Sequence, residues 1–123
     1  MSIDCNKTNC PVVATLDMIG GKYKALILWH LAIAKDKTRR FGELRRMIPQ
    51  ATQKMLTQQL RELEEDNLII RTVYPVVPPK VEYKLSELGE SINPVLDAMR
   101  VWGTSYMKSK GIEADCFMIT GRE

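Results

Sequence analysis

The segment that decides the fold is residues 52–66, which reads TQKMLTQQLRELEED. Thr52 is a favourable helix N-cap, because its hydroxyl can accept a hydrogen bond from a backbone N–H two or three residues later. Beyond it, Leu56, Leu60 and Leu63 follow the i, i+4, i+7 spacing of one helix face. The pattern predicts an amphipathic helix that buries this leucine stripe.

The opposite face of this predicted helix is rich in hydrogen-bond donors. Glutamine can read adenine through two hydrogen bonds, arginine and lysine suit guanine, and threonine can meet a base edge or a phosphate. A helix with donors in its N-terminal half is suited to entering a DNA major groove by that end. An ordinary solvent-facing helix is the alternative that this stretch leaves open by itself. The side chains concerned are Thr52, Gln53, Lys54, Thr57, Gln58 and Arg61.

A shorter helix is expected just before this segment. Residues 43–48 place Leu44 and Met47 inward, and Pro49 ends the helix because proline has no backbone N–H to donate. Two helices joined by so short a turn match a helix-turn-helix, here over residues 42–66. Basic side chains in and before the shorter helix are expected to contact DNA as well. These are Arg39 and Arg40 of a basic loop and Arg45 of the helix.

After the donor-rich helix the hydrophobic period changes from 3.6 to 2. Residues 69–85 alternate β-branched and aromatic residues with charged ones on either side of Pro78 and Pro79, which predicts a β-hairpin with a proline-stiffened tip. A hairpin directly after a helix-turn-helix is the wing of a winged helix. Arg71 and Lys80 are the wing residues best placed for phosphates or a minor groove. The expected fold class is therefore mainly α with a β-hairpin wing (α+β).

The C-terminal part predicts one long helix over residues 86–108, capped by Ser86 and kinked near Pro94. From Leu88 onward its apolar residues are spaced 4, 3, 4, 3, 4 apart, a narrow seam typical of a helix–helix interface. A short helix that starts at Pro11 is expected at the N-terminus. We expect these two helices to form a dimer interface. Its predicted residues are Leu16, Ile92, Val95, Met99, Trp102 and Tyr106.

The length of 123 residues predicts a single domain over residues 1–123, and the expected helices and strands place its ordered core over 10–108. Hydrophobic residues make up 45% and charged residues 27%, which is ordinary for a soluble globular protein. The formal net charge is +3, and it is uneven: residues 35–80 hold ten Lys/Arg against six Asp/Glu. A basic middle fits a segment that faces phosphates. Neither a membrane span nor a signal pattern is recognised, so a cytoplasmic protein is expected.

The sequence resembles the HxlR-type branch of the MarR-like winged-helix transcriptional regulators. The segments that carry the resemblance are CPV (10–12), LDMIGGKYKALILWHL (16–31), RFGELRRMIP (40–49), QKMLTQQLRELEEDNLIIR (53–71), VPPKVEYKLSELGESI (77–92) and LDAMRVWG (96–103). Thr52, Asn67 and Tyr23 depart from the residues usual in that family without disturbing the donor face. The resemblance implies a homodimer whose first and last helices pair. It also implies control of genes that detoxify electrophiles or oxidants.

Cys10, just before Pro11, is expected to stand at the positive end of a helix, with Lys7 close in sequence. Both features favour the reactive thiolate. The family resemblance implies that this cysteine senses thiol-reactive stress in some members. A capping residue without a signalling role is the alternative. Cys116 is the expected disulfide partner, and Cys5 is the second choice.

The residues show no catalytic constellation, and no enzyme activity or cofactor is expected. Four residues could in principle bind zinc, but they lack paired-ligand spacing, so no metal site is predicted: Cys5, Cys10, His30 and Cys116. His30 is expected to be a partly buried core histidine. The expected function is transcriptional regulation, with repression favoured over activation. We expect the protein to bind a pseudo-palindromic operator in double-stranded DNA as a homodimer.

Two other classes of function fit the sequence less well. A winged-helix module that only binds proteins would favour apolar anchors over the outward glutamines and cations. A thiol oxidoreductase would carry a closely spaced cysteine pair, which the sequence lacks. The sequence does not identify a small-molecule or oxidant inducer.

Overall fold

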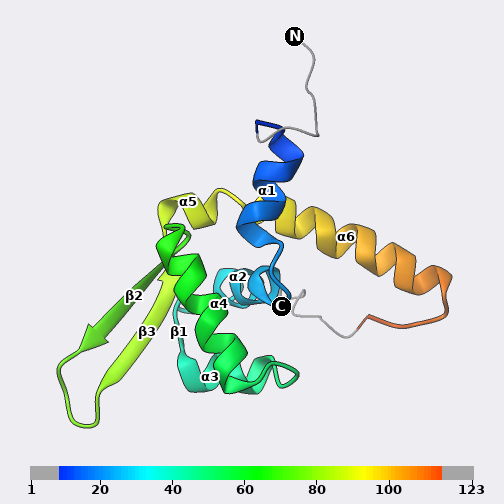
Figure 1. The fold of residues 1–123 in the computed structure, drawn as a ribbon. Helices are drawn as coiled ribbons and strands as arrows, with labels where there is room; N and C mark the ends of the chain where they lie inside the picture. The colour runs from blue at the N-terminus through cyan, green and yellow to red at the C-terminus, as the bar shows by residue number, and fades with distance from the viewer. Residues whose placement is uncertain (1–8, 115–123) are drawn as a thin grey trace.

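A computed structural model describes residues 9–114, which fold as a winged helix. The strands form one antiparallel sheet in the order β1-β3-β2. In Figure 1 the β2–β3 hairpin and α6 extend from opposite sides of the body formed by α2, α3 and α4. This is the α+β fold expected from the sequence. The elements are α1 (Pro11–Ile19), α2 (Lys24–Ala32), β1 (Arg39–Arg40), α3 (Phe41–Met47), α4 (Gln53–Glu65), β2 (Ile69–Tyr74), β3 (Lys80–Leu85), α5 (Glu87–Glu90) and α6 (Asn93–Ser109).

The leucine stripe holds α4 in the core. Leu56, Leu60 and Leu63 are at most 2% exposed and pack with the buried residues of α2. Burying each such side chain contributes about 1.5–3 kcal/mol. The hydroxyl of Thr52 accepts a hydrogen bond from the Met55 backbone N–H at 3.1 Å. The predicted helix, its buried face and its N-cap are all confirmed.

The chain leaves α4 through Asn67 and enters the wing. Asn67 has a φ of 62°, in the left-handed region that asparagine tolerates better than most residues. The N–H of Leu68 bonds to the carbonyl of Leu63 at 2.9 Å, and the N–H of Asn67 bonds to that of Glu64 at 2.9 Å. These two bonds satisfy the carbonyls of Leu63 and Glu64 near the end of the helix. β2 then pairs with β3 along its full length, where the period-2 pattern predicted a hairpin.

Two local predictions are wrong. Arg39 and Arg40, predicted to lie in a basic loop, make the short strand β1, which pairs with β3. Met47 does not point inward: it is 36% exposed, whereas Ile48 is 1% exposed. The helix ends at Met47, and the turn that follows directs the next side chain into the core instead.

The helix predicted over residues 86–108 is in fact two helices, α5 and α6. Ser86 caps only the short α5, where its Oγ accepts from the Gly89 N–H at 2.9 Å. Gly89 lies against the start of the wing, so close that a Cβ there would clash with the Leu68 carbonyl oxygen. Pro94 sits in the first turn of α6, where its missing N–H breaks no helical hydrogen bond.

We expect Gly89→Ala to lower the free energy of unfolding by about 1–3 kcal/mol, because the added methyl group must displace backbone. Gly42→Ala is the matched control, since its Cβ would meet only the flexible end of Arg46 at 3.9 Å. Removing a flexible glycine there should leave stability unchanged or raise it by up to about 1 kcal/mol. Urea unfolding of both variants measures the difference, and equal effects would contradict the packing described for α5.

One side of α6 packs on its own chain and an adjacent side remains open. Leu96 is 3% exposed in the core, and Ile92 is partly buried against it. Ile92 therefore differs from the rest of the predicted seam. The open side carries Val95, Met99, Trp102 and Tyr106, which are 39%, 48%, 70% and 48% exposed; Leu16 of α1 is 57% exposed.

Candidate nucleic-acid interface

The outward face of α4 is a polar surface open to solvent. Gln53, Lys54, Thr57, Gln58 and Arg61 are all exposed. Because the leucine stripe is anchored in the core, these side chains are held on one face of a fixed helix. The structure thus places these five side chains together on one exposed face of α4.

Several of the predicted side chains already have partners within the chain. Arg45 Nη1 donates to Gln53 Oε1 at 3.1 Å, which links the two helices of the helix-turn-helix. Arg40 is exposed at the start of α3, and its backbone N–H donates to Glu43 Oε1 at 2.7 Å. Arg39 is different, because it is partly buried and its Nε donates to the His30 carbonyl at 3.1 Å. The Arg39 guanidinium therefore already forms a hydrogen bond within the chain.

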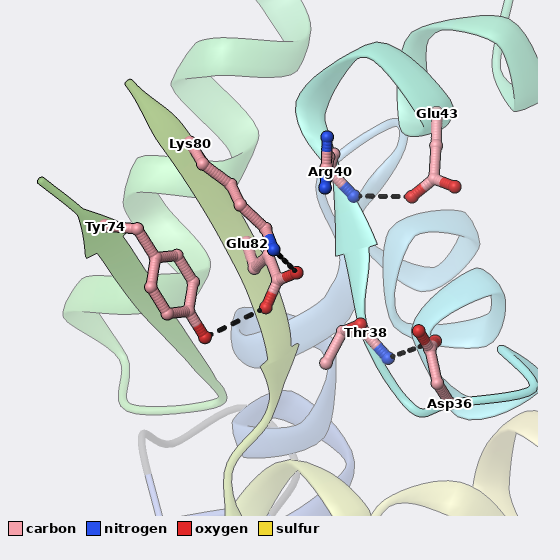
Figure 2. A network of polar contacts seen from close by, with 7 residues as sticks. All are labelled: Asp36, Thr38, Arg40, Glu43, Tyr74, Lys80 and Glu82. Carbon is pink, nitrogen blue, oxygen red and sulfur yellow. Dashed lines mark hydrogen bonds and ion pairs between the residues drawn. The ribbon is translucent and has the colours of Figure 1, made fainter. Parts of the chain in front are cut away.

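On the wing, Lys80 belongs to a polar cluster that Figure 2 shows. Its Nζ lies 3.3 Å from Glu82 Oε2 and 4.9 Å from the centre of the Tyr74 ring. The Tyr74 hydroxyl donates to the other carboxylate oxygen of Glu82 at 3.1 Å. A phosphate would therefore compete with Glu82 for Lys80. Arg71, in the middle of β2, is exposed.

The start of α2 contacts α4 and the turn before it through bonds that the sequence does not predict. The backbone N–H of Tyr23 donates to Gln59 Oε1 at 3.2 Å, and its hydroxyl donates to the Gln50 carbonyl at 3.0 Å. Lys24, only 7% exposed, forms an ion pair of 2.8 Å with Glu62. The only signal in the sequence was a lysine at the edge of an apolar stretch.

Electrostatics set the charge states of Glu62 on α4 and His30 on α2. The hydrogen bond from Gln58, and after it the Lys24 ammonium, hold the pKa of the Glu62 carboxyl below its usual value. Glu62 is therefore ionised at neutral pH. Burial, aided by the charge of Arg39, lowers the pKa of His30 and keeps it neutral there. This agrees with the prediction of a partly buried core histidine.

Cys10 occupies the N-cap position of α1, as predicted, and is fully buried. Cys5, Lys7 and Cys116 lie outside the described residues. Within residues 9–114, no group of three or more histidine, cysteine, aspartate or glutamate side chains could hold a metal ion.

The helices in residues 9–114 are all too short or too polar to cross a membrane.

A helix-turn-helix with a donor-rich second helix and a β-hairpin after it defines a winged helix-turn-helix protein. The same fold class includes transcriptional regulators of the MarR family. The chain belongs to the HxlR-like helix-turn-helix family, whose model matches residues 18–111.

Relatives in this family are transcriptional regulators. The Bacillus subtilis HTH-type regulator YdeP is 54% identical over 97 residues, which cover 79% of this chain and 73% of YdeP. The crystal structure of YtcD, also of B. subtilis, is similar with a TM-score of 0.74 and 53% identity, covering 80% of this chain and 97% of YtcD. The redox regulator HypR in its oxidised form has a TM-score of 0.72 and 51% identity, covering 78% of this chain and 96% of HypR.

Proposed function

We propose that the protein is a cytoplasmic homodimer that binds a pseudo-palindromic operator in double-stranded DNA and represses transcription. The observation that carries the proposal is the exposed row of donors on α4, held in place by a fully buried opposite face. Side chains of this kind at this spacing can form hydrogen bonds with base edges in a major groove. Membership of a family of helix-turn-helix regulators supports the same function.

The open side of α6 supports the homodimer. Four apolar side chains of this helix are 39–70% exposed, and the rings of Trp102 and Tyr106 stack at 5.4 Å. Covering them with the same surface of a second copy would remove them from water. Leu16 of α1 would extend this interface, while Ile92 would contribute mainly to the core of its own chain.

Cations beside α4 would supply contacts to phosphates. Arg71 and Lys80 stand on the wing. Arg40 directly precedes α3, and Arg45 of α3 bonds to Gln53 at the start of α4. Such contacts add affinity for any DNA sequence, and binding through them weakens as salt rises. Lys80 would contribute less than Arg71, because it must first leave Glu82.

Selection of bound fragments from a random DNA pool tests the proposal. We expect enrichment of two related half-sites in inverted orientation, about one helical turn or roughly 34 Å apart. A single copy of the half-site would argue against the dimer. Failure to enrich any sequence would argue for the competing function, a module that binds proteins only.

A response to oxidants is a further part of the proposed function, supported by the similarity to HypR. Oxidation would join Cys10 of one chain to Cys116 of the other and so alter the separation of the two α4 helices. Because Cys10 is fully buried, this reaction would require a local opening at the start of α1.

Diamide treatment of the wild-type protein is expected to give a cross-linked dimer on a non-reducing gel and a changed affinity for the selected DNA. Cys10→Ser and Cys116→Ser should each remove both effects, because each removes one sulfur of the bond. An oxidised wild-type protein with full affinity would rule out the redox switch. So would a Cys10→Ser protein that responds equally well, and in either case the DNA-binding proposal is unaffected.

A further inference from the structure

Glu62 connects the core of the protein to one of the base-reading side chains on α4. Its Oε1 lies 2.8 Å from Lys24 Nζ, and its Oε2 accepts from Gln58 Nε2 at 2.7 Å. The two oxygens of the carboxylate therefore have partners on two different helices. Lys24 belongs to α2, whereas Gln58 lies one turn before Glu62 on α4.

The Lys24 end of this connection is rigid. Its side chain is 9% exposed, and it is the first residue of a helix whose next turns are buried in the core. A buried ammonium group requires a partner, because leaving it unpaired in a low-dielectric environment is costly. Glu62, with a side chain 35% exposed, supplies that partner and is held in one position by it.

The Gln58 end has a defined orientation for a chemical reason. An ionised carboxylate only accepts hydrogen bonds, so the NH2 group of the Gln58 amide must face Glu62. The carbonyl Oε1 and the second N–H of this exposed amide are then available to another molecule. An acceptor beside a donor is the pattern that pairs with N6–H and N7 of adenine in the major groove.

We propose that Glu62, anchored by Lys24, is a positioning residue that fixes the orientation of the Gln58 amide and so makes Gln58 select adenine. The inference rests on the proposed DNA-binding function and assigns one base of its operator. Glu62 itself is negatively charged and would repel phosphates, so it acts through Gln58 and not by attracting DNA.

The test uses Glu62→Gln, which keeps the size of the side chain but can present either a donor or an acceptor to Gln58. We expect the preference for adenine over the other bases at one position of each half-site to fall about tenfold. Affinity for DNA of unrelated sequence should stay the same or rise, because a negative charge is removed. A merely structural role would instead lower affinity for all sequences alike, and would not lower the base preference alone.

Two further variants complete the experiment. Glu65→Gln removes the same charge one turn further along α4 and should leave the adenine preference intact. In a Gln58→Ala background, Glu62→Gln should have no additional effect on base preference, because its action passes through Gln58. Affinities are measured by fluorescence anisotropy on selected DNA with each base at the position in turn.

The outcomes separate this inference from the function on which it rests. A wild-type protein without any sequence preference would overturn the proposed function. A wild-type protein with such preference and a Glu62→Gln variant that keeps it in full would overturn only the role of Glu62. So would an additional loss of preference in the Gln58→Ala background, or a Gln58-dependent preference for a base other than adenine.

Discussion

Replacing Met99 and Trp102 together with glutamate is expected to convert the protein into monomers and to weaken operator binding by about 10²- to 10⁴-fold. Both side chains lie on the open side of α6, where they are 48% and 70% exposed. Two carboxylates from each chain would have to be buried without partners in an apolar interface. A monomer then loses the gain in affinity that comes from binding two linked half-sites at once.

Analytical ultracentrifugation and operator titration measure the two effects of this change. The double variant Val101→Glu, Thr104→Glu is the matched control, because it adds the same charges to exposed positions elsewhere around α6. We expect the control to remain dimeric and to bind normally. An unchanged dimer for the Met99 and Trp102 variant would show that the interface lies elsewhere on the protein.

The second large effect on operator affinity is expected from substitutions in α4. Changing four of its outward side chains to alanine should lower affinity for the selected operator by about 10³-fold or more, since base contacts provide most of the difference between specific and non-specific binding. The fold should survive, because all four are exposed and alanine favours helices. The four changes are Gln53→Ala, Lys54→Ala, Gln58→Ala and Arg61→Ala.

Circular dichroism and an electrophoretic mobility shift distinguish loss of contacts from loss of structure. Arg71→Ala is the comparison variant, because it removes a wing cation without touching α4. It should weaken binding to all sequences alike and reduce the salt dependence by about one unit of slope. Full operator affinity in the four-residue variant would mean that α4 is not the recognition helix.

Local patterns in the sequence were sufficient to predict the elements that frame this site. Thr52 caps α4 as its residue type suggested, and the leucines three and four residues apart are the ones that are buried. The period-2 stretch forms the wing, and α4 exposes the expected donors. In each case a few neighbouring residues carry the information.

The structural features that the sequence does not predict depend on contacts between distant parts of the chain. β1 exists only because its two residues pair with β3, about forty positions later. The break between α5 and α6 accompanies the contact of Gly89 with Leu68, while the apolar spacing runs through it unchanged. Lys24 pairs with Glu62 across two helices, so neither residue identifies the other in the sequence.

Sequence-specific reading of DNA by the exposed face of α4 is the property on which the proposed function depends. Its most direct test is the ratio of dissociation constants for shuffled and selected DNA of equal length, measured with the wild-type protein at a single salt concentration near the physiological value. We expect a ratio of about 10³ or more, as specific regulators show. A ratio near one, with tight binding to both, would mean that the protein holds DNA only through phosphates and would contradict the proposed function.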